Sequence, residues 1–262
     1  VQVDNIAYIN NQNNKVAFSW FPNAKHQVNF GGEAVIYDFE PFSVNANFAD
    51  SNIADISIEL QNEYAVEPAF YIEDNWKVNN RLTIRGGLRY SSFYNVGARD
   101  VVNYNPTSAG TYRNDRIIDT TSFGSGEIIA AFDGLQGLEP RLGINYKSSE
   151  NSAIKFSYNR MRQYIHLISN TTSSLPIDTW RPAGNYINPG TADQVAAGVN
   201  RNFKDGEWQL SIETYYKSLR DLVDYKNGAQ PTGVDNIEVD LMTGRGRSYG
   251  VEVQLDKKVG AL

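Results

Sequence analysis

Apolar and polar side chains alternate residue by residue over much of this 262-residue sequence, a pattern typical of extended strands. In residues 81–93, for example, Leu88 falls on one face and Arg89 on the other. Arginine in a strand needs water or a charged partner, so one face of the strand is apolar and the opposite face is polar. The same alternation recurs in segments 16–20, 28–36, 142–146, 154–158, 208–217 and 249–256.

Residues 60–77 are also extended in character, but Phe70 and Tyr71 compete for the apolar face, and both assignments stay open. Helical periodicity is limited to two short candidates, 127–132 and 218–223, either of which could equally be a turn in a loop. The sequence therefore predicts an all-β protein.

The connections between these strands alternate between very short and very long. Short ones, each carrying Asn, Gly, Pro or Ser, fall near residues 22–25, 79–80, 149–151 and 204–206, as tight hairpin turns require. Connections of about 20 to 45 residues lie around 39–59, 95–138, 162–190 and 221–245, and compact soluble domains rarely hold structureless loops of that length. A transmembrane β-barrel has this asymmetry, with short periplasmic turns and long extracellular loops.

Large aromatic side chains gather beside the short turns, where an aromatic girdle at the periplasmic rim of a barrel is expected. They are Trp20, Phe21, Trp76, Phe203 and Trp208. About nine strands can be counted, an odd number, whereas bacterial single-chain barrels close with an even number. We therefore predict an antiparallel transmembrane β-barrel that is partial, with residues 1–262 forming one segment of a larger barrel domain.

Two alternatives remain open on this pattern. A soluble or surface-attached β-rich binding or adhesion module would bury the apolar faces in a sandwich core. A passive porin would share the barrel but would need no energy coupling. Whether the apolar faces meet lipid or a second sheet separates the module from the two barrel hypotheses.

Composition excludes several classes of protein. The 24 basic and 30 acidic residues give a net charge of −6, without the cationic surface that nucleic-acid binding requires. The sequence has no cysteine, which excludes disulfides, thiolate metal sites and a cysteine nucleophile. No apolar run approaches the roughly 20 residues of a membrane-spanning helix, and the first residues lack the features of an export signal.

Catalytic motifs are missing as well. The two histidines, His26 and His166, are far apart and fit no metal-binding spacing, and the scattered aspartates fit no calcium loop. The glycine-rich segment 244–250 leads into a strand, so no helix N-terminus would meet a phosphate. We expect no enzyme activity, no resident metal and no cofactor.

Ligand-binding candidates are polar residues expected to face a barrel lumen or to lie near its mouth. On strands or beside them these are Arg85, Arg89, Arg160, Glu213, Tyr215 and Glu252. The stretch 162–181 adds aromatic stacking faces and planar donors suited to sugars or anionic groups, namely Arg162, Gln163, Tyr164, His166, Trp180 and Arg181. Charge ladders between neighbouring strands, or packing against a plug, would explain the same residues.

Several segments resemble the barrel of TonB-dependent outer-membrane receptors, in particular the Bacteroidetes group with an N-terminal carboxypeptidase-regulatory-like domain. The resemblance covers roughly residues 60 to 258 and rests on YIEDNWKVNNRLTIRGGLRY, LEPRLGINY, YNRMRQYIHLISNTTSSLPIDTWRP, TADQVAAGVNRNF, IETYYKSLRDLVDYKNGA and GRGRSYGVEVQLDKK.

The resemblance implies a barrel of about 22 strands around a plug, in the outer membrane of a Gram-negative bacterium. It also implies outer-membrane lipid and the TonB complex as partners, the latter through the plug region, and energy-coupled uptake of a scarce nutrient, which could be a siderophore, glycan, cobalamin or peptide. Neither the plug, the TonB box nor the terminal strands can be recognised in the sequence, so we expect these to be absent from this segment.

Overall fold

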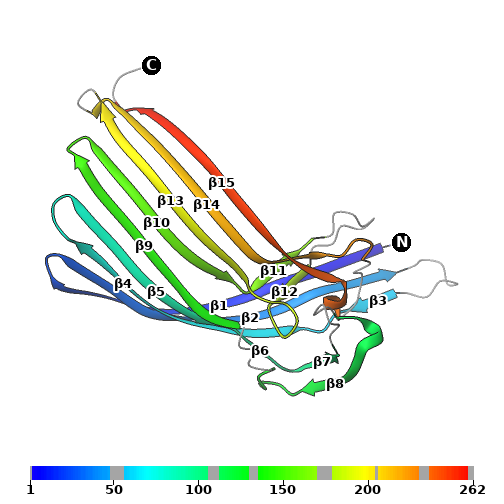
Figure 1. Cartoon of the computed structure of the whole chain (residues 1–262). Helices are drawn as coiled ribbons and strands as arrows, with labels where there is room; N and C mark the ends of the chain where they lie inside the picture. Colours follow the sequence, from blue (N-terminus) through cyan, green and yellow to red (C-terminus); the bar gives the residue numbers. More distant parts are fainter. Residues whose placement is uncertain are drawn as a thin grey trace.

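The computed structural model describes residues 2–47, 56–105, 112–129, 135–169, 179–203, 206–229 and 236–258, with side chains described from residue 8 onward except at 41–59. Nine antiparallel strands follow one another in chain order across one curved sheet (Figure 1). They are β1 (Gln2–Asn23), β2 (His26–Asn47), β4 (Glu63–Lys77), β5 (Leu82–Ser92), β9 (Gln136–Ser149), β10 (Ser152–Gln163), β13 (Gly190–Phe203), β14 (Trp208–Tyr225) and β15 (Leu241–Lys257).

Two short strands, β3 (Ile56–Glu59) and β6 (Tyr94–Val96), add to β2 and β4 at one end of the sheet. Within the described residues β1 pairs only with β2, and β15 pairs only with β14, so the sheet is open at both edges. The predicted all-β class and the count of nine barrel strands are confirmed.

The predicted short turns near 22–25, 79–80 and 149–151 are confirmed and lie at one end of the sheet (Figure 1). At the same end Phe203 of β13 pairs with Trp208 of β14, and residues 204–205 of the fourth predicted turn lie outside the described residues. The turn between β1 and β2 shows how tightly this end is built, because Asn23 Oδ1 accepts a hydrogen bond of 2.9 Å from the Lys25 amide. Asn79 does the same before β5, accepting from the amides of Arg81 and Leu82 at 2.8 and 2.9 Å. Asparagine at these positions satisfies backbone donors that the turn leaves outside the sheet.

The long connections hold more regular structure than the sequence suggested. The nine-stranded sheet is called the wall below. β2 runs on to Asn47 and β14 to Tyr225, so parts of the predicted loops continue these strands of the wall. The 95–138 connection forms a hairpin of β7 (Arg99–Tyr104) and β8 (Ile117–Phe123), and the 162–190 connection a hairpin of β11 (Ile165–Ile168) and β12 (Thr179–Pro182). Residues 48–55, 106–111, 170–178 and 230–235 lie outside the described residues.

Neither helix candidate is helical where it can be assessed. Residues 218–223 lie inside β14, and 127–129 are non-helical, while 130–132 fall outside the described residues. Helical structure in the described ranges is limited to short 3-10 turns such as η1 (Asn114–Arg116) and η4 (Ile237–Asp240). Within those ranges, no helix is long and apolar enough to cross a membrane.

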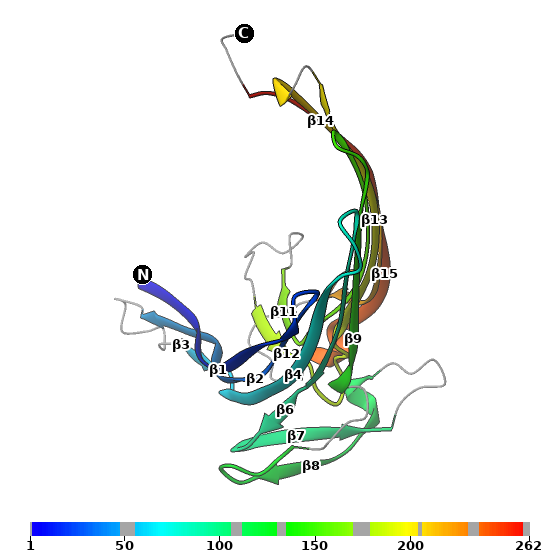
Figure 2. The ribbon, with the colours of Figure 1, turned by 90° about the vertical axis from the view of Figure 1, so that its left-hand side faces the viewer.

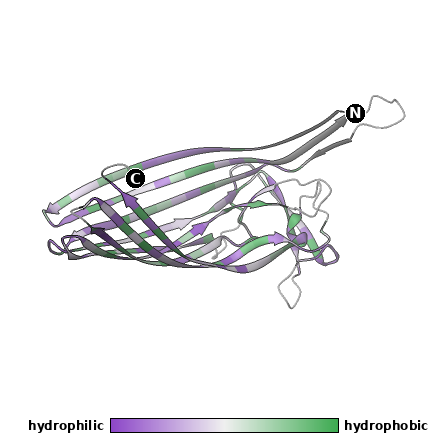
Figure 3. Ribbon diagram, turned by 90° about the horizontal axis from the view of Figure 1, so that it is seen from above, coloured by the Kyte–Doolittle hydropathy of each residue, from purple (hydrophilic) through white to green (hydrophobic). Residues whose placement is uncertain are grey.

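Strand pairing places the alternating side chains on two distinct faces, and Figure 3 shows hydrophobic and hydrophilic residues alternating along the strands. The register of β4 with β5 settles the open assignment of residues 60–77, because Phe70 pairs with Tyr90 and Ile72 with Leu88. Both β4 side chains therefore belong to the apolar face, where they are 65% and 55% exposed. Tyr71 pairs with Arg89 on the opposite, polar face.

The hairpin β11–β12 lies on the concave side of the sheet (Figure 2). There the buried side chains of Phe39, Ala65 and Phe93 form one apolar cluster with Tyr164 and Ala183, which flank the hairpin. The rings of Phe93 and Tyr164 stack with centroids 5.2 Å apart. The concave face is therefore polar along most of the wall but apolar where the hairpin docks, at the end opposite the short turns.

Candidate functional site

The polar face of the wall is braced by a charge network around Arg89. Its Nη1 donates to Glu139 Oε1 at 2.5 Å, and its Nη2 donates to Glu33 Oε1 at 2.8 Å and to Glu67 Oε1 at 3.3 Å. These carboxylates come from β9, β2 and β4, so one guanidinium links four strands. Charge-assisted bonds of this kind are strong in a partly buried setting. Arg89, a predicted ligand contact, is thus fully engaged within the wall.

A groove of about 350 Å³ lies nearer the short turns on the same face and is lined by Arg85, Lys155 and Glu213 among others. Arg85 is 61% exposed at its side chain and forms an ion pair of 3.3 Å with Glu73. Glu213 pairs in register with Glu252, placing two predicted candidates side by side. Like charges directly opposite each other on paired strands repel, and the cationic side chains of Arg85 and Lys155 line the same groove as Glu213.

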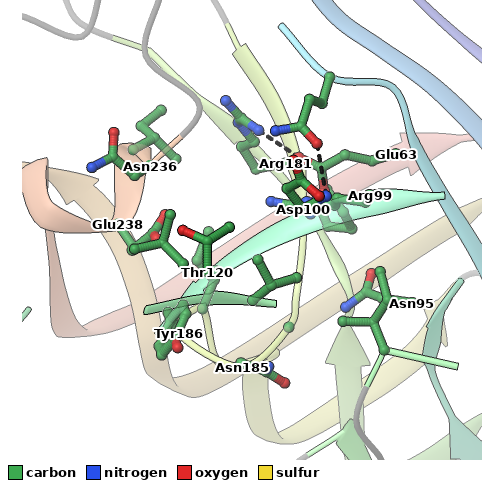
Figure 4. A pocket seen from close by; sticks show the side chains of 18 residues that line it. Glu63, Asn95, Arg99, Asp100, Thr120, Arg181, Asn185, Tyr186, Asn236 and Glu238 are labelled. Atoms are coloured by element: carbon green, nitrogen blue, oxygen red, sulfur yellow. Dashed lines mark hydrogen bonds and ion pairs between the residues drawn. The ribbon is translucent and has the colours of Figure 1, made fainter. Parts of the chain in front are cut away.

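A second cavity, also about 350 Å³, lies at the end of the molecule opposite the short turns, and we call it the rim cavity (Figure 4). It is enclosed by the start of β4, by β6 to β8, by the end of β12 with the following loop, and by η4. The lining side chains used below are Glu63, Asn95, Arg99, Arg181, Tyr186 and Glu238.

Glu63 is the junction of the rim cavity. Its carboxylate accepts a hydrogen bond from Arg181 of β12 and forms an ion pair of 2.7 Å with Arg99 of β7 (Figure 4). Glu63 and Arg181 are 3% and 2% exposed. Because these residues lie on β4, β7 and β12, a single buried carboxylate fastens both inserted hairpins to the barrel wall.

Hydrogen-bond acceptors face the rest of the rim cavity. Asn95 is 6% exposed and donates through Nδ2 to the Ala183 carbonyl at 2.8 Å, whereas its Oδ1 has no hydrogen-bond partner among the described residues. Glu238 forms no ion pair within the described part of the chain, and burial raises the pKa of its carboxyl. A buried amide oxygen without a donor costs free energy that a bound donor would recover.

Three tyrosines pack against one another beside these acceptors. The ring centroids of Tyr112 and Tyr186 are 4.6 Å apart, and those of Tyr104 and Tyr186 are 5.3 Å apart. Burial and the nearby charge of Glu238 raise the pKa of the Tyr186 hydroxyl. Tyrosine in such a cluster presents both a flat apolar ring and a hydroxyl that stays protonated at neutral pH.

The candidates from the 162–181 stretch do not form one site. Arg181 lines the rim cavity. Tyr164 is buried against Phe93, with 2.8 Å between its hydroxyl and Ser91 Oγ. His166 lies 3.1 Å through Nε2 from the Asn188 carbonyl, and burial lowers the pKa of its imidazole. The other candidates of this stretch lie on strands: Arg162 and Gln163 end β10, and Trp180 lies in β12.

Arg160 differs from the expectation that it faces the lumen. Its Nε donates to Asp193 Oδ1 at 2.7 Å. Arg160 stands two residues after Tyr158 on β10, and Asp193 stands two residues before Val195 on β13, so both lie on the apolar face with Tyr158 and Val195. Tyr215 remains on the polar face as expected, paired with Gly250. Among the residues that the structure describes, no three His, Asp or Glu side chains form a group that could hold a metal ion.

The sequence-based list did not include Glu63, Asn95, Arg99 and Glu238, all of which line the rim cavity. No local pattern marks them, because they come from four separate segments that tertiary folding brings together. Glu63 gives no signal of its own, because it follows Gln61 and Asn62 and reads as the polar start of a strand.

Comparisons with known proteins agree with this fold. The model of the family described as TonB dependent receptor-like, beta-barrel, matches residues 3–259. Among solved structures, the FrpB iron transporter of Neisseria meningitidis superposes with a TM-score of 0.58 at 16% identity, over 96% of this chain and 34% of that one. No curated protein matches the chain significantly.

Two further structures are similar. The ferric yersiniabactin uptake receptor FyuA of Yersinia pestis has a TM-score of 0.58 at 12% identity, over 98% of this chain and 34% of the receptor. The alcaligin receptor FauA of Bordetella pertussis has a TM-score of 0.53 at 11% identity, over 98% and 37%. The chain thus spans about a third of the length of the solved structures that it matches.

Proposed function

Because the chain belongs to the TonB-dependent receptor β-barrel family, we propose that it forms part of the wall and mouth of a receptor that takes up a scarce nutrient by energy-coupled transport. Proteins of this family lie in the outer membrane of Gram-negative bacteria. The apolar face then meets outer-membrane lipid, and the concave polar face lines the lumen. The short turns are periplasmic, and the rim cavity opens on the extracellular side.

The observation that carries the assignment of a ligand site is the rim cavity with its acceptors. Asn95 Oδ1 and the Glu238 carboxylate both line it, and the Tyr186 ring provides an apolar surface beside them. Such a lining suits a ligand that is rich in hydrogen-bond donors, with hydroxyl or ammonium groups and a flat face. FyuA is a ferric yersiniabactin uptake receptor and FauA is an alcaligin outer-membrane receptor. For the present chain we count a siderophore among the members of that ligand class.

Energy coupling through TonB belongs to the proposal as well, and it would act through a plug inside the lumen. A passive pore is the weaker alternative, because the β11–β12 hairpin occupies part of the concave side and docks there through a buried apolar cluster (Figure 2). An enzyme function has no support from the groups that line either cavity.

The test uses the receptor as the only uptake route in a strain starved of one nutrient at a time. Ferric alcaligin, ferric yersiniabactin and a neutral oligosaccharide are supplied separately, with and without functional TonB. We expect one source to support growth only when TonB is present. Growth that is independent of TonB on every source would refute energy coupling.

The rim cavity is tested by the substitution Glu238→Gln, which keeps the side-chain size and removes the charge. We expect about fivefold to tenfold weaker binding of the supported source, because a hydrogen bond to a charged acceptor is about 1 kcal/mol stronger than one to the neutral amide that replaces it. The control is Arg113→Gln, whose exposed pair with Asp115 lies outside the cavity lining. Equal affinities for both variants and the unaltered receptor would place the ligand elsewhere.

A further inference from the structure

A compact group of arginines occupies the apolar face at its extracellular end. Strand pairing arranges this face of β10, β13, β14 and β15 in rows of residues that lie side by side. Three successive rows contain almost no charge: Ile154, Val199, Ile212, Val253; then Phe156, Ala197, Thr214, Val251; then Tyr158, Val195, Tyr216, Tyr249. Three of the four side chains in the last row are tyrosines, as expected at a lipid interface.

The next two rows are cationic. Arg160, Asp193, Ser218 and Arg247 form the first, and Thr191, Arg220 and Arg245 continue into the second. We call Arg160, Arg220, Arg245 and Arg247 the arginine patch. With Asp193 among them, these side chains carry a net charge of +3. Arg162 stands two residues after Arg160 on β10 but is not included in the patch. Its guanidinium lies directly beside Gly137 of β9, in the space that a Cβ on this glycine would occupy.

Asp193 holds two members of the patch in place. Its Oδ1 accepts from Arg160 Nε and from the Tyr158 hydroxyl, both at 2.7 Å, and its Oδ2 accepts from Arg220 Nη2 at 2.7 Å. Both arginine side chains stay partly exposed, at 36% and 45%. Arg245 and Arg247 are exposed and form no ion pair within the described residues. The patch therefore presents ordered guanidinium donors together with unpaired ones.

The position of the patch matches the outer headgroup layer. Trp208 of β14 stands at the periplasmic rim, ten residues before Ser218 of the first cationic row. Ten strand residues at about 3.3 Å each, tilted by roughly 40°, rise about 25 Å along the membrane normal. That is the height of the apolar band of an outer-membrane barrel, so the arginines emerge where the acyl chains end.

The patch is confined to one side of the wall. Toward the same end of the apolar face, β2, β4 and β9 carry Asp38, Tyr64 and Leu138 instead of cations. A general attraction to an anionic membrane would place basic residues on every strand. A cluster of arginines on three strands, oriented by an aspartate on a fourth, instead favours a specific phosphate-bearing partner, because arginine binds phosphate oxygens in a bidentate manner.

We propose that the arginine patch is a binding site for the phosphate groups of the glycolipid in the outer leaflet of the outer membrane. The site rests on the membrane placement of the barrel, and it is independent of the nutrient that the receptor transports. A bound lipid would extend the wall laterally and would hold the extracellular ends of β10 to β15 together through their shared phosphate.

The test compares three preparations of the purified receptor: phosphatidylcholine nanodiscs with diphosphoryl lipid A, with the fully dephosphorylated form of the same lipid, or with inorganic phosphate in the buffer. We expect only diphosphoryl lipid A to raise the Tm of the receptor. Each arginine in contact contributes about a fivefold gain in affinity, so the double substitution Arg245→Gln with Arg247→Gln should weaken lipid binding by about 25-fold.

The matched control is Arg201→Gln with Lys257→Gln, which removes two cations from the same face at the periplasmic rim. It should leave the lipid affinity unchanged, and Arg245→Lys with Arg247→Lys should restore most of it. Each variant is first shown to be folded, by the shift of its band on a mild detergent gel when the sample is boiled, and to keep its uptake activity. Equal stabilisation by the dephosphorylated lipid, stabilisation by inorganic phosphate alone, or equal losses in both double variants would overturn the proposal.

Discussion

Substitution of Glu63 by Gln should release the two inserted hairpins while leaving the barrel wall intact. The Glu63 carboxylate pairs with Arg181, which is 2% exposed, and with Arg99, which is 23% exposed at its side chain. Breaking a buried pair by removing one partner typically costs about 3 to 5 kcal/mol, because the remaining buried guanidinium of Arg181 loses its ion pair with Glu63. The wall keeps its own hydrogen-bonded ladders, so this cost falls on the docking of β7–β8 and β11–β12.

Hydrogen–deuterium exchange followed by mass spectrometry measures that docking directly. A loss of about 3 to 5 kcal/mol corresponds to roughly two to three and a half orders of magnitude in the local opening equilibrium. We expect exchange in peptides covering 99–104 and 179–187 to accelerate by such a factor, up to the rate of the unprotected chain. Peptides from 208–216 in β14 should keep their protection and serve as the internal reference.

The control for this experiment is Asp115→Asn, which breaks the ion pair with Arg113. Both side chains of that pair are more than 60% exposed, and exposed pairs contribute little to stability. Exchange in all peptides should match that of the unaltered receptor. Unchanged protection of 99–104 and 179–187 in the Glu63→Gln variant would refute the reasoning, since it would show that apolar packing alone holds the hairpins.

Three further predictions concern a titrating group, a tight packing contact and the two faces. Burial raises the pKa of the Glu238 carboxyl. The protection of η4 against hydrogen–deuterium exchange should therefore be greatest below the ordinary glutamate pKa of about 4.3 and should fall as the pH rises through the raised value. The substitution Glu238→Gln should abolish this pH dependence. Gly31→Ala would place a Cβ 2.2 Å from the Val16 carbonyl oxygen and should destabilise the β1–β2 pair by about 1 to 3 kcal/mol. Gly86→Ala is the control, because no atom lies within 4 Å of its added Cβ, and it should leave the stability unchanged. Measurements of Tm compare the two variants. In this cysteine-free chain, Val251→Cys should react with a lipid-confined reagent and Glu252→Cys only with a water-soluble one; the same reactivity at both would contradict the assigned faces.

Much of the wall could be predicted because its signals are local. Alternation with a period of two depends only on neighbouring residues, so the faces of 208–217 and 249–256 follow directly from the sequence. Residues 60–77 could not be assigned in this way, because only pairing with Leu88 and Tyr90 places Phe70 on the apolar face. For Arg160 the signal was present, since it stands two residues after Tyr158, which the sequence placed on that face.

The rim cavity and its hairpins could not be predicted by the same means. Glu63 and Arg181 are 118 positions apart, and no spacing rule joins two residues at such a distance. The β7–β8 and β11–β12 segments alternate irregularly, so their strands depend on tertiary contacts such as the stacking of Phe93 on Tyr164. Long connections in a sequence of this kind are better read as places where inserted hairpins form.

The length of β1 and β2 sets how far the receptor reaches from the cell. Each strand has 22 residues, which at about 3.3 Å per residue and a tilt of roughly 40° rise about 55 Å, against an apolar band of about 25 Å. In the membrane placement proposed above, the sheet would stand some 30 Å clear of the lipid on this side. A capsule or surface polysaccharide thinner than that height would then leave the mouth uncovered, so that diffusing ligands and antibodies would reach it without crossing the surface layer.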